Sequence, residues 1–200
     1  MTGAPPAAHS RAGGAPLIIT AELPPDIAHW ADALRREYYP PERNKLAAHV
    51  TLFHAMAPSQ LDELKSVLAR MAGEFAPPPA VLSGLLPLGT GTALAIDSPQ
   101  MLMIREEIAQ HFHGALTSQD SHAPRLHITV QNKVTERESK ALQRALSAEL
   151  SDTYFGRPFR FTGLALHHYR GGPWEMVGKW SFRGQSGGSP RSGKKAKHRS

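Results

Sequence analysis

Two short segments of the sequence share one pattern: a histidine, a β-branched residue, a threonine and an aliphatic residue. They are HVTL at residues 49–52 and HITV at residues 127–130. Because side chains alternate between the two faces of a strand, each segment predicts a strand with histidine and threonine on one face and apolar side chains on the other. The fold must therefore bury two apolar strand faces against its core.

The pattern is too specific for its repetition to be accidental. A chain with this content of histidine and threonine is expected to contain about 0.02 copies by chance when an aliphatic residue is required at both intervening positions. Outside the pattern, the two halves of the chain have negligible identity. We therefore interpret the two segments as equivalent parts of one site.

The rest of the sequence predicts strands and helices in alternation. Strands are expected over residues 17–23, 48–56, 80–98 (a pair joined at 89–91), 124–134, 159–169 and 174–182, and helices over 26–39, 59–75, 98–116 and 135–150. Thr135 and Glu138 have the spacing of a capping box at the start of the last helix. Each half thus runs strand, helix, motif strand, helix and strand pair, except that the first strand of the second half is not evident.

This order predicts an α+β fold with largely antiparallel sheets and helices on their outer faces. The flanking segments 1–16 and 184–200 are predicted to be disordered. Segment 184–200 carries five of the six net positive charges of the chain. We interpret it as a solvated tail with some attraction to polyanions, and a dedicated RNA-binding arm is the alternative.

The polar residues of the two motifs suit phosphoryl chemistry. His49 and Thr51 share one strand face, and His127 and Thr129 share another. If the strands lie close together, one histidine can remove a proton and the other can supply one, because the imidazole pKa is about 6.5. The threonine hydroxyls can donate hydrogen bonds to phosphate oxygens. Such chemistry needs neither a metal ion nor a nucleophilic cysteine, and the chain has no cysteine.

HVTL and HITV resemble the paired His-x-Thr-x signatures of the two-histidine (2H) phosphoesterase superfamily, specifically its 2′-5′ RNA ligase-like branch. PPERNKLAAHVTLFHAM and LHHYRGGPWEMVGKWSF also resemble segments of that branch, so the resemblance covers about residues 17–183. It implies a bilobal fold of two pseudo-symmetric units around a central cleft. The lobes are expected at about 17–97 and 98–183, with strand exchange between them as an alternative.

The resemblance also implies a metal-independent acid–base pair, His49 and His127, with Thr51 and Thr129 bound to phosphate. Members of the family open 2′,3′-cyclic phosphates, hydrolyse or form 2′-5′ linkages, or hydrolyse cyclic phosphates of ADP-ribose. We therefore expect RNA ends or small nucleotides as substrates, and no cofactor, metal or obligate protein partner. A non-catalytic RNA-binding module that uses the cleft and the basic tail is the alternative.

Further residues are expected to contact the substrate: Arg125, Lys133, Phe53 and Tyr169. The first two join the polar face of the second motif strand, and the third joins that of the first. For the tyrosine, stacking on a base at the cleft edge competes with simple sheet packing. His54 is out of phase with the first motif histidine, which predicts a core or surface position, and Trp174 is expected in the core or at a sheet edge.

The sequence also predicts a cytoplasmic location. No apolar run approaches the roughly 20 residues that cross a bilayer. The N-terminal residues lack the charged start and continuous apolar stretch of a secretory signal. Together with the absence of cysteine, these features favour a reducing compartment and no membrane segment.

Overall fold

We describe residues 14–150 and 154–185 of the protein from a computed structural model, with the backbone alone for residues 149 and 150. The segments predicted to be disordered, 1–16 and 184–200, lie outside these ranges except for residues 14–16 and 184–185. The basic tail and its proposed RNA-binding role therefore fall outside the described residues.

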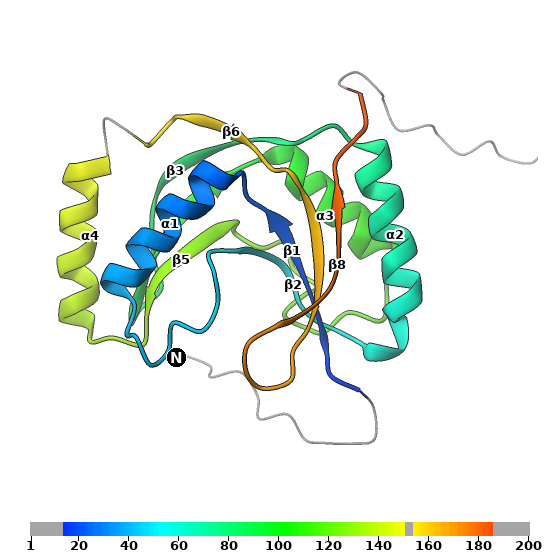
Figure 1. The fold of residues 1–200 in the computed structure, drawn as a ribbon, viewed down its shortest axis with the longest axis horizontal. Helices are drawn as coiled ribbons and strands as arrows, with labels where there is room; N and C mark the ends of the chain where they lie inside the picture. The colour runs from blue at the N-terminus through cyan, green and yellow to red at the C-terminus, as the bar shows by residue number, and fades with distance from the viewer. Residues whose placement is uncertain (1–13, 151–153, 186–200) are drawn as a thin grey trace, which may run out of the picture.

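Helices and strands follow the predicted alternation (Figure 1). In chain order they are β1 (Leu17–Glu22), α1 (Pro25–Tyr38), β2 (Val50–Met56), a 3₁₀ turn (Pro58–Gln60), α2 (Leu61–Glu74), β3 (Pro79–Pro87), β4 (Gly91–Asp97), α3 (Pro99–His111), β5 (His127–Asn132), α4 (Glu136–Leu150), β6 (Pro158–Arg160), β7 (Gly163–His168) and β8 (Glu175–Ser181).

One predicted strand, over 159–169, is divided into β6 and β7. Between them the N–H of Phe161 donates to the carbonyl of Pro78, next to β3, at 3.0 Å. The N–H of Thr162 donates instead to the carbonyl of Glu22 in β1, at 2.9 Å. The chain therefore passes from one sheet to the other at this point.

Side-chain caps determine where α3 and α4 begin. The hydroxyl of Ser98 accepts the N–H of Met101 at 3.4 Å, and Pro99 occupies the first turn of α3, where its missing N–H has no cost. At α4, the Thr135 hydroxyl accepts the N–H of Glu138 at 3.2 Å, and the Glu138 carboxylate accepts the N–H of Thr135 at 2.8 Å. The predicted capping box is confirmed.

The described strands form two antiparallel four-stranded sheets. The first sheet has the order β2-β1-β7-β8, and the second has the order β5-β4-β3-β6. Each sheet takes strands from both halves of the chain, so a division near residue 97 does not separate the sheets. After the second helix of each half the chain crosses between the sheets. Strand β3 follows α2 and pairs with β4, and β7, which follows α4 and the short β6, pairs with β1. The counterpart of β1 in the second sheet is therefore β4.

The helices cover the two sheets from different sides. In Figure 1, α2 and α4 lie at opposite ends of the molecule. Helix α2 packs on β7 and β8 of the first sheet, and α4 packs on β3 and β4 of the second. Helix α1 follows a strand of the first sheet but contacts β5 of the second. Within the described residues, no helix is long and apolar enough to cross a membrane.

A buried arginine joins α1 to the second motif strand. Arg35 is 3 % exposed, and one guanidinium nitrogen donates to the carbonyl of Thr129 in β5 at 2.6 Å. The other donates to the side chain of Asn44 at 2.8 Å and to the carbonyl of Leu46 at 2.9 Å. These bonds connect α1 both to β5 and to the segment that precedes β2. Arg35 therefore helps to fix the position of the two motif strands relative to each other.

We predict that Arg35→Met lowers the free energy of unfolding by about 2–5 kcal/mol, because it leaves three partly buried acceptors without their charged donor. Urea denaturation of the wild-type and variant proteins measures this difference. The neighbouring Arg36 is exposed, and Arg36→Met is the matched control, with an expected change within about 0.5 kcal/mol. Equal stability of the two variants would contradict this role of Arg35.

Candidate active site

Both motif histidines make the same local hydrogen bond. Nδ1 of His49 lies 2.7 Å from the carbonyl oxygen of Ala47, and Nδ1 of His127 lies 2.6 Å from that of Arg125. Because a carbonyl oxygen only accepts hydrogen bonds, Nδ1 carries the proton in each ring. Nε2 of each neutral imidazole is then left with a lone pair that can accept a proton.

The two histidines stand at equivalent places on neighbouring strands. His49 immediately precedes β2 and His127 begins β5. These strands are edges of different sheets, and they contact each other. The two imidazoles are close enough for a charge on His127 to lower the pKa of His49. The structure thus brings the predicted acid–base pair together.

The motif threonines follow on the same strands. Thr51 and Thr129 are both partly exposed, and Thr51 pairs with Thr20 of β1. In the part of the chain that the structure describes, neither motif hydroxyl has a hydrogen-bond partner. Two hydroxyl groups are therefore available to an incoming ligand.

A bulge in β2 changes the expected positions of the next two residues. Thr20 of β1 pairs with Thr51, but its neighbour Ile19 pairs with Phe53, so Leu52 is the extra residue. The bulge turns Phe53 into the core, where it is fully buried with the Arg105 guanidinium 4.5 Å from its ring centre. The prediction that Phe53 joins the polar face is wrong, because strict alternation does not reveal a bulge.

The same bulge presents His54 to the cavity that Thr51 and His127 line. The ring is partly exposed, and its Nδ1 lies 3.2 Å from the carboxylate of Asp120. Asp120 is buried and also accepts the backbone N–H groups of His54 at 2.8 Å and Ala55 at 2.9 Å. The sequence pattern predicted a core or surface position for His54 and gave no indication of this carboxylate partner.

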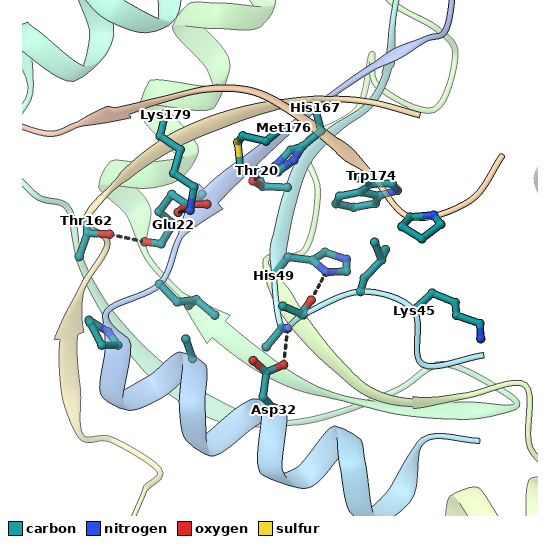
Figure 2. A pocket seen from close by; sticks show the side chains of 18 residues that line it. Thr20, Glu22, Asp32, Lys45, His49, Thr162, His167, Trp174, Met176 and Lys179 are labelled. Carbon is teal, nitrogen blue, oxygen red and sulfur yellow. Dashed lines mark hydrogen bonds and ion pairs between the residues drawn. The ribbon is translucent and has the colours of Figure 1, made fainter. Parts of the chain in front are cut away.

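A cavity of about 720 Å³ opens beside His49 (Figure 2). Trp174, in the loop between β7 and β8, packs against the rings of both His49 and His167, with centroids 4.5 and 5.4 Å away. Nε2 of His167 lies 3.0 Å from the hydroxyl oxygen of Thr20. The cavity therefore combines an aromatic wall with polar side chains from the first sheet.

Charged groups line the far end of the same cavity, where Glu22 and Lys179 form an ion pair (Figure 2).

Trp174, expected in the core or at a sheet edge, is half-buried in the cavity wall. Loop residues such as this tryptophan cannot be assigned to a site from strand alternation, because loops have no fixed period.

A smaller cavity, of about 270 Å³, is lined by Thr51 and His127. Arg125 and His54 also line it, so one of the predicted substrate contacts lies at this site. Two others do not line either cavity. Lys133 follows β5 with a φ of 58° and donates its N–H to the Asn132 side chain, and Tyr169 is exposed at the end of β7.

Burial sets the protonation of the two motif histidines. Loss of solvation lowers the pKa of His49 to about 4, although the carbonyl of Ala47 opposes the shift. The pKa of His127 is also lowered, first by burial and then by the charges of His54 and Arg125. Both imidazoles are therefore neutral at pH 7 in the absence of ligand. A bound phosphate would favour protonation of either ring by its negative charge.

This arrangement supports proton transfer by two histidines on either side of one reacting group. Within the described residues, no group of three or more histidine, aspartate and glutamate side chains is arranged to hold a metal ion. The chemistry that the site offers from its own residues is acid–base catalysis with hydroxyl hydrogen-bond donors.

The chain resembles known proteins in its sequence and in its fold. A family model described as the 2′-5′ RNA ligase superfamily matches residues 23–173. No curated protein sequence matches the chain.

Solved structures share the fold. TT0787 of Thermus thermophilus is 17% identical, with 86% of this chain and 100% of that chain covered and a TM-score of 0.59. E. coli LigT complexed with NADP+ is 15% identical, with 87% and 100% covered and a TM-score of 0.55. A structure described as a phosphoesterase is 16% identical, with 86% and 99% covered and a TM-score of 0.54. These similarities confirm the predicted bilobal α+β fold.

We predict that the low pKa of His49 makes stability depend on pH. The unfolded chain binds the proton near pH 6.5, whereas the folded protein resists it down to about pH 4. The unfolded state therefore gains protons first, and stability falls as the pH drops from about 6.5 to about 4. His49→Gln removes this contribution.

Urea denaturation at pH 7 and pH 4.5 measures the effect. Wild-type protein should lose about 1–3 kcal/mol more than His49→Gln between these pH values. The two proteins differ only at position 49, so the difference between their losses reports the contribution of this histidine. Parallel losses in the two proteins would contradict the burial of a neutral imidazole at this position.

Proposed function

The chain belongs to the 2′-5′ RNA ligase superfamily, and on that premise we propose that it is a metal-independent phosphodiesterase acting on 2′,3′-cyclic phosphates or 2′-5′ linkages. The observation that carries the proposal is the matched pair of hydrogen bonds from Nδ1 of His49 and His127. They leave an Nε2 on each of two contacting strands for proton transfer. Ligation is the same chemistry in the opposite direction.

In the hydrolytic direction, one Nε2 accepts a proton from water while the water oxygen attacks phosphorus. The bond between phosphorus and the ribose oxygen breaks, and the second histidine donates its Nε2 proton to that oxygen. The two histidines end with exchanged protonation states. We assign His49 as the base because its pKa near 4 keeps its ring unprotonated, and His127 is then the acid, protonated as the anionic substrate binds. In ligation the two roles exchange.

Thr51 and Thr129 bind the non-bridging phosphate oxygens in this scheme. Hydroxyl donors aimed at those oxygens stabilise the charge that develops as the new bond forms. The free hydroxyls on β2 and β5, as far as the described residues extend, support this role, since they need not break an existing hydrogen bond to bind phosphate. Arg35 supports it indirectly by holding the backbone of Thr129.

RNA ends or small nucleotides are the proposed substrates. Ligand cavities for small molecules commonly measure about 300–1,000 Å³. The cavity beside His49, at about 720 Å³, falls in this range, and Trp174 offers a face on which a base can stack. E. coli LigT has been crystallised with 3′-AMP and with NADP+, which supports a small nucleotide as the ligand of this related chain.

We predict turnover of 2′,3′-cyclic nucleotides or 2′-5′-linked oligonucleotides by purified protein in EDTA. His49→Gln and His127→Gln should each lower kcat by about 10³-fold, because each removes one proton-transfer group. His111→Gln is the control, since that histidine pairs with Glu63 at the surface. Full activity of either motif variant, or strict dependence on added metal, would contradict the mechanism. No turnover by the wild-type protein would favour the RNA-binding alternative.

We predict a smaller effect for the hydroxyl groups. Thr51→Val and Thr129→Val should each lower kcat by about 100-fold, because a donor to the developing charge is lost while the shape is kept. Thr→Ser at the same positions should retain most activity. Steady-state kinetics of the four variants on one cyclic nucleotide tests this role. An equal loss in the valine and serine variants would argue against hydrogen bonding by these residues.

A further inference from the structure

The smaller cavity contains more positive charge than the proposed mechanism uses. Its basic and titratable lining residues are Arg105, Arg125, His54, His122 and His127. Among the residues that line it, Asp120 alone carries an acidic side chain. A cavity with this balance favours an anionic occupant.

The carboxylate of Asp120 is already occupied by hydrogen bonds within the protein. It accepts the backbone N–H groups of His54 and Ala55, the hydroxyl of Thr117 at 3.2 Å and Nδ1–H of His54. Burial raises the pKa of Asp120, but the hydrogen bonds from His54 and Ala55 outweigh it and lower the pKa. Asp120 is therefore an ionised, buried acceptor that orients His54 and leaves no oxygen to bind a further cation.

His54 is held differently from the two motif histidines. Its Nδ1 must carry the proton, because a carboxylate only accepts hydrogen bonds. Its side chain remains 42% exposed, so the ring has a free edge. His49 and His127 donate to neutral carbonyl groups, whereas the partner of His54 is negatively charged. The Asp120 carboxylate therefore fixes the orientation of the His54 ring.

Arg105 adds a second buried cation to the same lining. It is 2% exposed and donates to the backbone carbonyl of Asp120. Its Nε has no hydrogen-bond partner among the described residues. One guanidinium nitrogen of Arg105 lies 3.8 Å from the carboxylate of Glu106, and the charge of Asp120 also stabilises it. The unsatisfied Nε–H is therefore the donor of Arg105, among the described residues, that this lining leaves for a further acceptor.

The position of the cavity relates this charge to the proposed reaction. The reacting phosphate must reach both His49 and His127. His49 lines the larger cavity, whereas His127 and Thr51 line the smaller one. The space around His54 and Arg125 therefore lies on the His127 side of the proposed reacting phosphate.

We propose that His54, oriented by Asp120, and Arg125 form a subsite for a second phosphate group of the substrate. The proposal rests on the proposed function for the position of the first phosphate. The substrate class is then a nucleotide or RNA end that carries a further phosphate beside the reacting phosphodiester. His54 and Arg125 both lower the pKa of His127 by their charge, so an anion in the subsite would also favour the protonated, proton-donating form of His127.

Binding of inorganic phosphate and of pyrophosphate tests the subsite. Isothermal titration of the full chain at constant ionic strength, in EDTA, gives the ratio of their dissociation constants. Wild-type protein should bind pyrophosphate at least about 10-fold more tightly than phosphate, as expected for one further charged hydrogen bond. His54→Gln should reduce this ratio to below about 3-fold and change phosphate binding little. Arg125→Gln should reduce the ratio in the same way.

The matched control is His111→Gln, which also removes a histidine paired with a carboxylate but lies outside both cavities. It should keep the wild-type ratio. An unchanged ratio in His54→Gln, or a wild-type ratio near one, would overturn the subsite. Turnover is scored separately: a normal binding ratio without phosphodiesterase activity would overturn the proposed function and leave the subsite in place.

Discussion

Each sheet of this protein contains strands from both halves of the chain, and the geometry of the site depends on that exchange. Pairing of β7 with β1 and of β3 with β4 leaves β2 and β5 as the free edges of their sheets. Edge strands of two sheets can meet without hydrogen bonding to each other, which leaves room for a ligand between their side chains. Arg35 then connects the segment before β2 to the backbone of β5.

The hydrogen-bond partners of the three histidines at the site differ, and this difference gives them different proposed roles. His49 and His127 donate Nδ1–H to neutral carbonyl groups and stay unprotonated at pH 7 because burial disfavours charge. His54 instead pairs with the ionised Asp120. The same cleft can thus contain two histidines proposed to exchange protons, His49 and His127, and a third, His54, proposed to bind an anion. The backbone bulge at Leu52 is what allows Thr51 and His54 to face the same cavity.

The alternation of polar and apolar residues was sufficient to predict the two motif strands. Local capping signals were sufficient to predict the start of α4. Alternation failed at Phe53, because a bulge inserts one residue and reverses the phase of the residues that follow it. It also could not find Asp120, Arg35 or Trp174, which approach the site from loops and a helix distant in sequence. Those positions depend on tertiary packing, for which a single sequence carries no periodic signal.

The assignment of His49 and His127 as the proton-transfer pair depends on their protonation states, which can be measured in solution. Long-range ¹H–¹⁵N NMR of imidazole-labelled protein distinguishes the Nδ1–H tautomer, the Nε2–H tautomer and the imidazolium ion. At pH 7 without ligand, we predict that His49 and His127 are both neutral with the proton on Nδ1, and that added phosphate protonates Nε2 of one of them. An Nε2–H tautomer at either position, or two imidazoles that do not respond to phosphate, would contradict this assignment.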